Sequence, residues 1–212
     1  RFKVGDRVFY AGEIEKPGTN SQYHIVDEDI VGPMPSGLDF AAAAALPLTS
    51  ITAWEALFDR LDVNRSVPGG AGAVVIIGGA GGVGSIAIQL LRALTNLTVI
   101  ATASRAQSQE WVREMGAHYV IDHSQPLAPQ IEALGVGQPA FVFSPTHTED
   151  YITDIAEFIA PQGRLALIDD PEVFDITPFK AKSVSVHWEL MFTRSLYGTA
   201  DKAMQHGLLN EV

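Results

Sequence analysis

An apolar run that ends in a cluster of glycines constrains the fold of this chain more than any other feature. Residues 73–77 are all apolar, and Gly79-Ala80-Gly81-Gly82-Val83-Gly84 follows after one further glycine. Apolar residues at helical spacing continue from Ile86 to Leu94. A strand, a glycine-rich turn and a helix in this order match the G-x-G-x-x-G pattern of dinucleotide-binding units.

Each glycine of the motif has a separate physical role. We expect Gly79 to adopt the positive φ of a tight turn, and Gly81 to leave no Cβ between the backbone and a pyrophosphate. Gly84 allows the helix to lie close to the strand, and the helix start at Gly82 and Val83 offers unpaired N–H groups to the phosphates. The alternative is a structural connection without a ligand. A Walker-type phosphate loop is excluded, because no Gly-Lys-Ser/Thr sequence follows.

Segments typical of strands and helices alternate through the rest of the chain. We expect strands at 97–101, 119–122, 140–143, 164–168 and 183–187, and helices at 107–115, 126–134 and 151–159. Before the glycines, residues 3–10 and 21–26 have strand-like patterns, and residues 49–61 have a helical one. The repeated β-α-β order predicts an α/β fold with a doubly wound parallel sheet. Ligands of such sheets bind beyond the carboxyl ends of the strands, so we expect the strand ends at Gly78, Ala101, Phe143 and Ile168 to line the site.

Charge and composition exclude several classes of function. The net charge of −11 argues against a general nucleic-acid or anionic-membrane partner. The absence of cysteine excludes disulfides and cysteine-rich zinc sites within the chain. The apolar run 41–48 is too short to span a membrane and contains Pro47, so we expect a soluble, cytoplasmic protein. Because the chain starts at Arg1 and stops within a helical pattern, we expect a fragment of a longer protein.

The residues after the second expected strand favour NADP(H) over NAD. An acidic residue about twenty residues past the glycines would bind the ribose hydroxyls of NAD. Here Ser104 and Arg105 follow the strand, and the first carboxylate is Glu110. A hydroxyl and a guanidinium suit the 2′-phosphate of NADP(H). The alternative is that Ser104 caps a helix and Arg105 is merely solvated.

Four segments together resemble the medium-chain dehydrogenase/reductase superfamily, and most closely its NADPH-dependent quinone oxidoreductases and zinc-type alcohol dehydrogenase-like members. These segments are residues 4–8, 46–54, 79–84 and 116–122. The resemblance implies that residues 1–50 are the C-terminal part of a GroES-like catalytic β domain. It also implies a Rossmann NADP-binding domain over 51–190 and a return segment over 191–212.

The resemblance also implies roles for single residues. Thr52 and Phe192 match positions near the nicotinamide, and Ser144 matches a strand end that lines the cofactor. His123 matches a position beside the 2′-phosphate; the alternative is an exposed loop histidine. Leu48 occupies the position of a cysteine that binds zinc in the zinc-dependent members. Because leucine cannot bind zinc, we expect no catalytic metal.

The resemblance implies hydride transfer from NADPH to a quinone or an α,β-unsaturated carbonyl, with the fragment alone inactive. Two alternatives are a related enoyl reductase and a nucleotide-binding module without turnover. No general acid can be named, although Tyr10, Tyr23 and His147 are available. Residues 183–188 alternate polar and apolar side chains without an internal proline or lysine, which is typical of an unprotected edge strand. We therefore expect a homodimer through this strand, testable with Ser185→Pro; the alternative is a loop that covers the edge.

Overall fold

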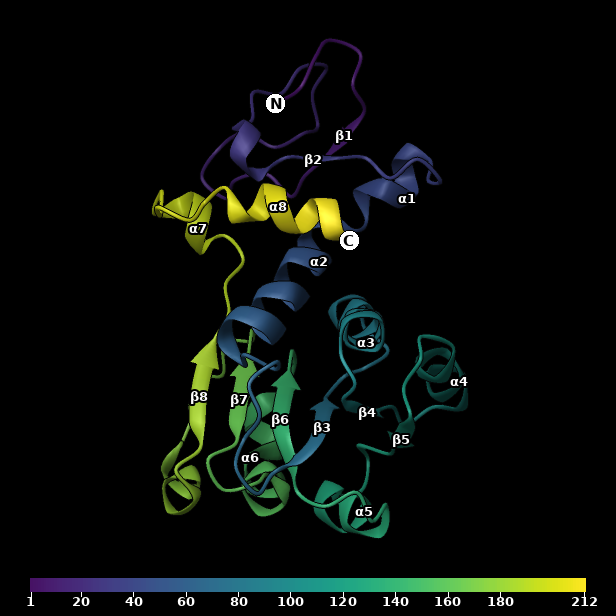
Figure 1. Ribbon diagram of the computed structural model, residues 1–212, viewed down its shortest axis with the longest axis vertical. Coiled ribbons are helices and arrows are strands. Elements are labelled where there is room, and N and C mark those ends of the chain that lie inside the picture. Colours follow the sequence, from purple (N-terminus) through teal and green to yellow (C-terminus); the bar gives the residue numbers. More distant parts are fainter. The chain divides into compact units, whose positions relative to one another are not determined.

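The computed structural model describes residues 1–212 and contains two compact units. One unit joins residues 1–52 to residues 190–212, and the other comprises residues 53–189. The larger unit holds a six-stranded sheet in the order β5-β4-β3-β6-β7-β8, with every neighbouring pair parallel (Figure 1). The strands are β3 (Ala71–Ile76), β4 (Thr98–Thr102), β5 (Tyr119–Ile121), β6 (Pro139–Ser144), β7 (Arg164–Leu167) and β8 (Ser185–Trp188). The predicted doubly wound parallel sheet is confirmed.

Helical segments cover both faces of this sheet. The first face packs against η2, a π-helix (Glu55–Arg60), α3 (Gly82–Leu94) and α4 (Ala106–Glu114). The second face packs against α5 (Leu127–Ala133), α6 (Thr148–Phe158) and the 3-10 helix η3 (Thr177–Lys182). The connections from β3 to β5 lie on the first face and those from β5 to β8 on the second, because the chain returns to the centre of the sheet between β5 and β6.

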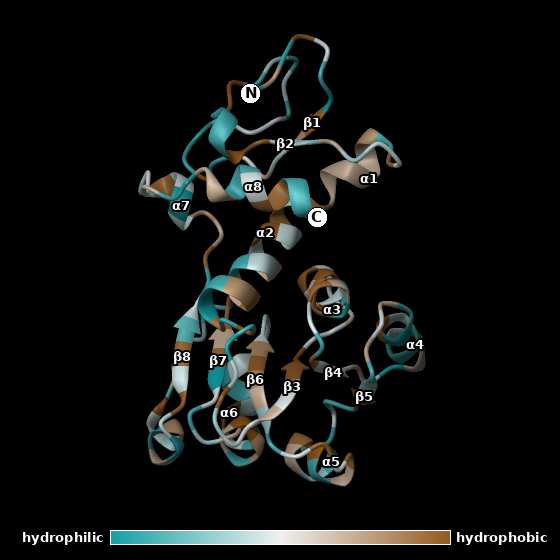
Figure 2. Ribbon diagram, viewed as in Figure 1, coloured by the Kyte–Doolittle hydropathy of each residue, from teal (hydrophilic) through white to brown (hydrophobic).

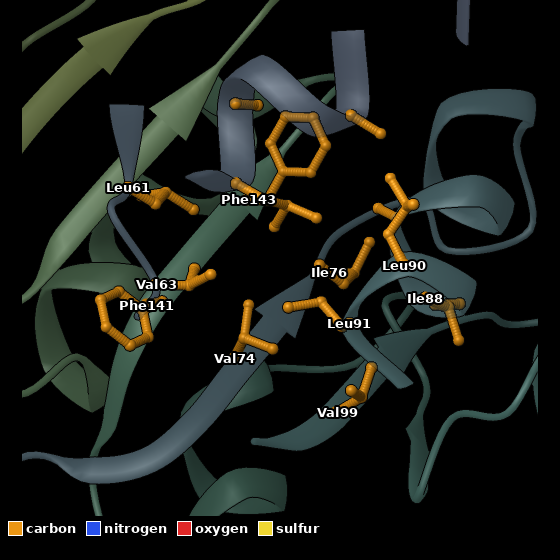
Figure 3. Close-up of a cluster of buried hydrophobic side chains, with 14 of the residues drawn as sticks. Leu61, Val63, Val74, Ile76, Ile88, Leu90, Leu91, Val99, Phe141 and Phe143 are labelled. Carbon is orange, nitrogen blue, oxygen red and sulfur yellow. The ribbon is translucent and has the colours of Figure 1, made fainter. Parts of the chain in front are cut away.

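Strand β3 shows why the central run of the sequence is uniformly apolar. Val74 and Ile76 point into the cluster on the first face, together with Leu91 of α3 and Phe143 of β6 (Figure 3). Val75 points into the cluster on the second face. Because successive side chains of a strand point to opposite faces, a strand covered on both sides needs apolar residues throughout. Figure 2 accordingly shows the C-terminal part of β3 in hydrophobic colours.

The helix expected over residues 49–61 changes its hydrogen-bonding pattern partway along. It starts as α2 (Pro47–Trp54) and continues as η2, whose end is marked by a hydrogen bond of 2.9 Å from the Leu61 N–H to the Ala56 carbonyl. Pro47 therefore begins a helix, a position that tolerates the missing N–H. The preceding helix α1 (Phe40–Ala44) ends earlier, and the Asp39 side chain caps its start by accepting from the Ala42 N–H at 2.8 Å.

The smaller unit is built around a short antiparallel pair, β1 (Val8–Phe9) and β2 (Gly32–Pro33). It also contains the 3-10 helix η1 (Glu28–Ile30), α7 (Thr193–Leu196) and α8 (Met204–Glu211). Helix α8 packs on β2 so closely that a Cβ on Gly32 would lie 2.5 Å from the Leu209 Cβ. The strand predicted over residues 21–26 is wrong, because the alternating Tyr23 and Ile25 are 90% and 92% exposed and bury no face. The GroES-like assignment stays a prediction.

One stretch meets the length and composition of a membrane span. Residues 40–60 comprise 21 residues with a mean hydropathy of 1.3, and half of their most apolar part is buried within the structure. A core helix of a soluble protein meets the same criteria, so this feature is weak evidence of a membrane segment.

Candidate functional site

The glycine-rich turn after β3 is held by Thr102 at the end of β4. The Gly78 N–H donates to the Thr102 hydroxyl at 3.0 Å, and the Gly79 N–H donates to the Thr102 carbonyl at 3.2 Å. The residue with positive φ is Gly78, at +66°, so the expectation of a positive φ at Gly79 is wrong. Gly79 is required for a different reason: a Cβ there would lie 2.9 Å from the Ala101 Cβ.

Gly81 and Gly84 differ in what a side chain would meet. A Cβ on Gly84 would lie 2.6 Å from the Gly78 carbonyl oxygen and 2.8 Å from the Gly79 Cα. This is the close approach of helix and strand that the motif predicts. A Cβ on Gly81 would have its nearest neighbour at 3.4 Å, so the fold alone tolerates a methyl group there. Packing within the chain therefore does not require glycine at position 81.

The start of α3 presents free donors beside this turn. Gly81 is the N-cap residue, and the first hydrogen bond within the helix runs from the Ser85 N–H to the Gly81 carbonyl at 2.8 Å. The N–H groups of Gly82, Val83 and Gly84 precede that bond and have no acceptor within the helix. Three unpaired donors at the positive end of a helix of 13 residues favour an anion.

A cavity of about 480 Å³ lies beside the turn and brings together residues from several strand ends. It collects Gly81, Ser104, Arg105 and His123, four of the residues that the sequence predicts to bind the cofactor. The remaining lining residues are Gly78, Ala80, Thr102, Ala103, Ser108 and Thr146. Sequence reasoning missed Thr102, Ser108 and Thr146; the first directly follows a predicted strand, but nothing in the sequence alone distinguishes the other two.

The geometry of Ser104 and Arg105 disfavours the simple capping alternative. The N-cap residue of α4 is Arg105, and no side chain caps this helix start. The Arg105 side chain is exposed and also lines an adjoining hollow beside Trp111. The open N–H groups of α4 and a free guanidinium therefore border the same cavity, which suits a phosphate. His123 lines the same cavity, and its Nδ1 is buried and has no hydrogen-bond partner.

Three predicted residues lie at strand ends without lining the cavity. Phe143 is buried in the core, and Ile168 packs at its margin. The Ser144 hydroxyl bonds that of Thr148 at 2.8 Å, and the Thr148 N–H donates to the Asp169 carboxylate at 2.7 Å. Ser144 and Asp169 thus fix the loop that carries Thr146.

The other predicted cofactor residues, Thr52 and Phe192, belong to the smaller unit. Thr52 is 4% exposed, and its hydroxyl donates to the Leu48 carbonyl at 2.8 Å. Phe192 is the N-cap residue of α7. Their expected role near the nicotinamide stays a prediction.

The three candidate proton donors, Tyr10, Tyr23 and His147, lie in different surroundings. The Tyr10 hydroxyl lies 3.0 Å from Nδ1 of His24, and burial raises the pKa of Tyr10 above its usual value. Tyr23 is 90% exposed, whereas His147 has a φ of +51° and bonds Thr146 through Nδ1 at 2.6 Å. None of these contacts identifies a proton donor.

The residues of the chain do not fit a zinc site. No three histidine, cysteine, aspartate or glutamate side chains are arranged to hold a metal ion. At the position where the resemblance implies a zinc ligand, Leu48 contributes an apolar side chain and uses its carbonyl for Thr52.

Known dehydrogenases are similar to this chain in sequence. A family model described as zinc-binding dehydrogenase matches residues 82–206. A zinc-type alcohol dehydrogenase-like protein of Staphylococcus aureus is 37% identical over 213 residues, covering 100% of this chain. The chain spans 63% of the length of that relative.

Solved structures agree in fold with this chain. A protein from Rhizobium etli, assigned as a zinc-dependent alcohol dehydrogenase, has 65% sequence identity and a TM-score of 0.98 over 99% of this chain and 62% of its own. The quinone oxidoreductase of Thermus thermophilus, solved with and without NADPH, has 25% identity and a TM-score of 0.66 over 85% of this chain and 56% of its own.

Proposed function

The chain belongs to the zinc-binding dehydrogenase family, within the medium-chain dehydrogenase/reductase superfamily, and from this premise we propose that the protein is an NADPH-dependent oxidoreductase. We propose a quinone or an α,β-unsaturated carbonyl compound as the acceptor, reduced without zinc. The observation that supports this best is the cavity in which the glycine turn, Ser104, Arg105 and His123 meet. A complex with NADPH is known for the Thermus thermophilus quinone oxidoreductase.

Different residues of this chain bind different parts of the dinucleotide. The N–H groups of Gly82, Val83 and Gly84 bind the pyrophosphate, and Gly81 leaves room for its approach. The Arg105 guanidinium and the Ser104 hydroxyl bind the 2′-phosphate, with Nδ1 of His123 as a further partner. When bound, NADPH supplies a hydride to the acceptor. An acceptor whose negative charge develops on a conjugated oxygen needs only hydrogen-bond donors to stabilise it.

The test compares the two dinucleotides by calorimetry. The wild-type chain should bind NADPH more tightly than NADH. Arg105→Ala should weaken the binding of NADPH by roughly 1.5–3 kcal/mol and leave the affinity for NADH nearly unchanged. Arg113→Ala is a matched control, because it removes the same charge from the last turn of α4, away from the cavity. Equal affinities of the wild type for the two dinucleotides would refute the choice of cofactor.

Catalysis needs a separate measurement on the full-length protein. Oxidation of NADPH in the presence of a benzoquinone should be followed by the loss of nicotinamide absorbance. Tight binding of NADPH without turnover of quinones or enones would support a nucleotide-binding module instead.

We also propose a homodimer through the edge strand β8. The Ser185 N–H donates to the Gly163 carbonyl at 3.0 Å and the Glu189 N–H to the Leu167 carbonyl at 2.9 Å, so both point into the sheet. Alternation along the strand then directs the N–H groups of Val186 and Trp188 to the free edge. Ser185→Pro is therefore the wrong test, because it would break the sheet itself; Val186→Pro removes an outward donor instead.

A further inference from the structure

Trp111 of α4 reaches across to the first turn of α3. Its indole Nε1–H donates to the Ser85 hydroxyl at 2.8 Å, and that hydroxyl donates to the Gly81 carbonyl at 2.8 Å. The indole is 44% exposed and lines a hollow of about 430 Å³ together with Ala80 and Arg105. A continuous chain of two hydrogen bonds thus joins α4 to the glycine-rich turn.

The Ser85 hydroxyl acts as both donor and acceptor in this arrangement. It has one proton, which it gives to the Gly81 carbonyl, and it accepts the indole proton on a lone pair. Ser85 is only 8% exposed, so the indole is the donor that takes the place of water. Without Trp111 the hydroxyl would be less firmly directed at the Gly81 carbonyl, because hydrogen bonds in a chain polarise one another.

The Gly81 carbonyl controls the direction of a neighbouring donor. The peptide group between Gly81 and Gly82 is planar and trans, so the Gly82 N–H points opposite to the Gly81 carbonyl. That carbonyl accepts both the Ser85 N–H and the Ser85 hydroxyl, each at 2.8 Å. Holding the carbonyl toward the helix therefore aims the Gly82 N–H outward from its start.

We infer that Trp111 is a positioning residue for dinucleotide binding, which acts through Ser85 to orient the Gly81–Gly82 peptide toward the pyrophosphate. This inference rests on the proposed function. Because the pyrophosphate is common to both dinucleotides, Trp111 affects the binding of NADPH and of NADH alike. Arg105 affects the binding of NADPH alone.

The test substitutes Trp111→Phe, which keeps an aromatic ring and removes the indole N–H. The dissociation constants of both NADPH and NADH should rise about fivefold, the equivalent of one neutral hydrogen bond. Trp188→Phe is the matched control, because Trp188 lies on the edge strand β8 and does not line the cavity. This variant removes an indole bond of 3.2 Å to the backbone carbonyl of Asp169 and should leave both constants unchanged. Circular dichroism and the Tm of each variant report whether the fold is retained.

Ser85→Ala and the double variant of Ser85→Ala with Trp111→Phe complete a double-mutant cycle. If Trp111 acts through Ser85, the double variant should bind no more weakly than Ser85→Ala alone. Unchanged affinities in a folded Trp111→Phe variant, a loss restricted to NADPH, or additive losses in the double variant would each overturn the inference. A wild-type chain that binds neither dinucleotide would instead refute the proposed function.

Discussion

Gly84→Ala should destabilise the larger unit, because the added methyl group has no space. Its Cβ would lie 2.6 Å from the Gly78 carbonyl oxygen and 2.8 Å from two backbone atoms of Gly79. All three are main-chain atoms of a turn fixed by Thr102, so relief requires α3 to move away from β3. Overpacking of this kind costs about 1–3 kcal/mol, against a gain of about 0.5–1 kcal/mol from replacing glycine by alanine within a helix.

Two further glycines supply the controls. Gly207 lies inside α8 with nothing within 4 Å of an added Cβ, so Gly207→Ala should stabilise the protein by the helical gain alone. Gly81→Ala should leave stability nearly unchanged but weaken dinucleotide binding, because its methyl group would project where we place the pyrophosphate. Thermal unfolding followed by circular dichroism should resolve these effects at about 2–4 °C per kcal/mol. A Gly84→Ala variant as stable as Gly207→Ala would refute the steric argument.

Two other predictions concern charge and assembly. Lys202 bonds Asp27 and holds the pKa of this carboxyl below its usual 3.8, while the pKa of Lys202 is raised. The ion pair therefore stabilises the folded state between the ordinary pKa values of the carboxyl and the lysine. This stability is lost as the pH falls through the lowered pKa of Asp27. Lys202→Met should therefore cost about 0.5–1 kcal/mol in urea unfolding at neutral pH, with the difference vanishing in acid; an equal difference in acid would contradict the pairing. Val186→Pro should shift sedimentation from dimer to monomer with the fold retained, whereas Val186→Ala, which keeps the N–H, should remain dimeric. A wild type that sediments as a monomer at high concentration would contradict the dimer.

The sequence alone determined the class of fold and the position of the glycine-rich turn. Apolar runs, glycines and helical spacing are local signals, and a βα unit with G-x-G-x-x-G has few other interpretations. The same local reasoning predicted a site at Ser104 and Arg105, since a missing acidic residue after the second strand is visible without a structure, and both residues line the cavity beside the turn. It failed at residues 21–26, where alternation occurs without a face to bury.

The tertiary structure decided which residues meet and which backbone group has which role. Thr146 borders the cavity because the Asp169 carboxylate, from a different strand end, fixes its loop. Gly78 rather than Gly79 takes the positive φ, and Gly79 is required instead because a Cβ there would lie 2.9 Å from the Ala101 Cβ. Likewise, Trp111 reaches Ser85 only because α3 and α4 pack on the same face of the sheet. These contacts join residues far apart in the chain, and local propensity contains no information about them.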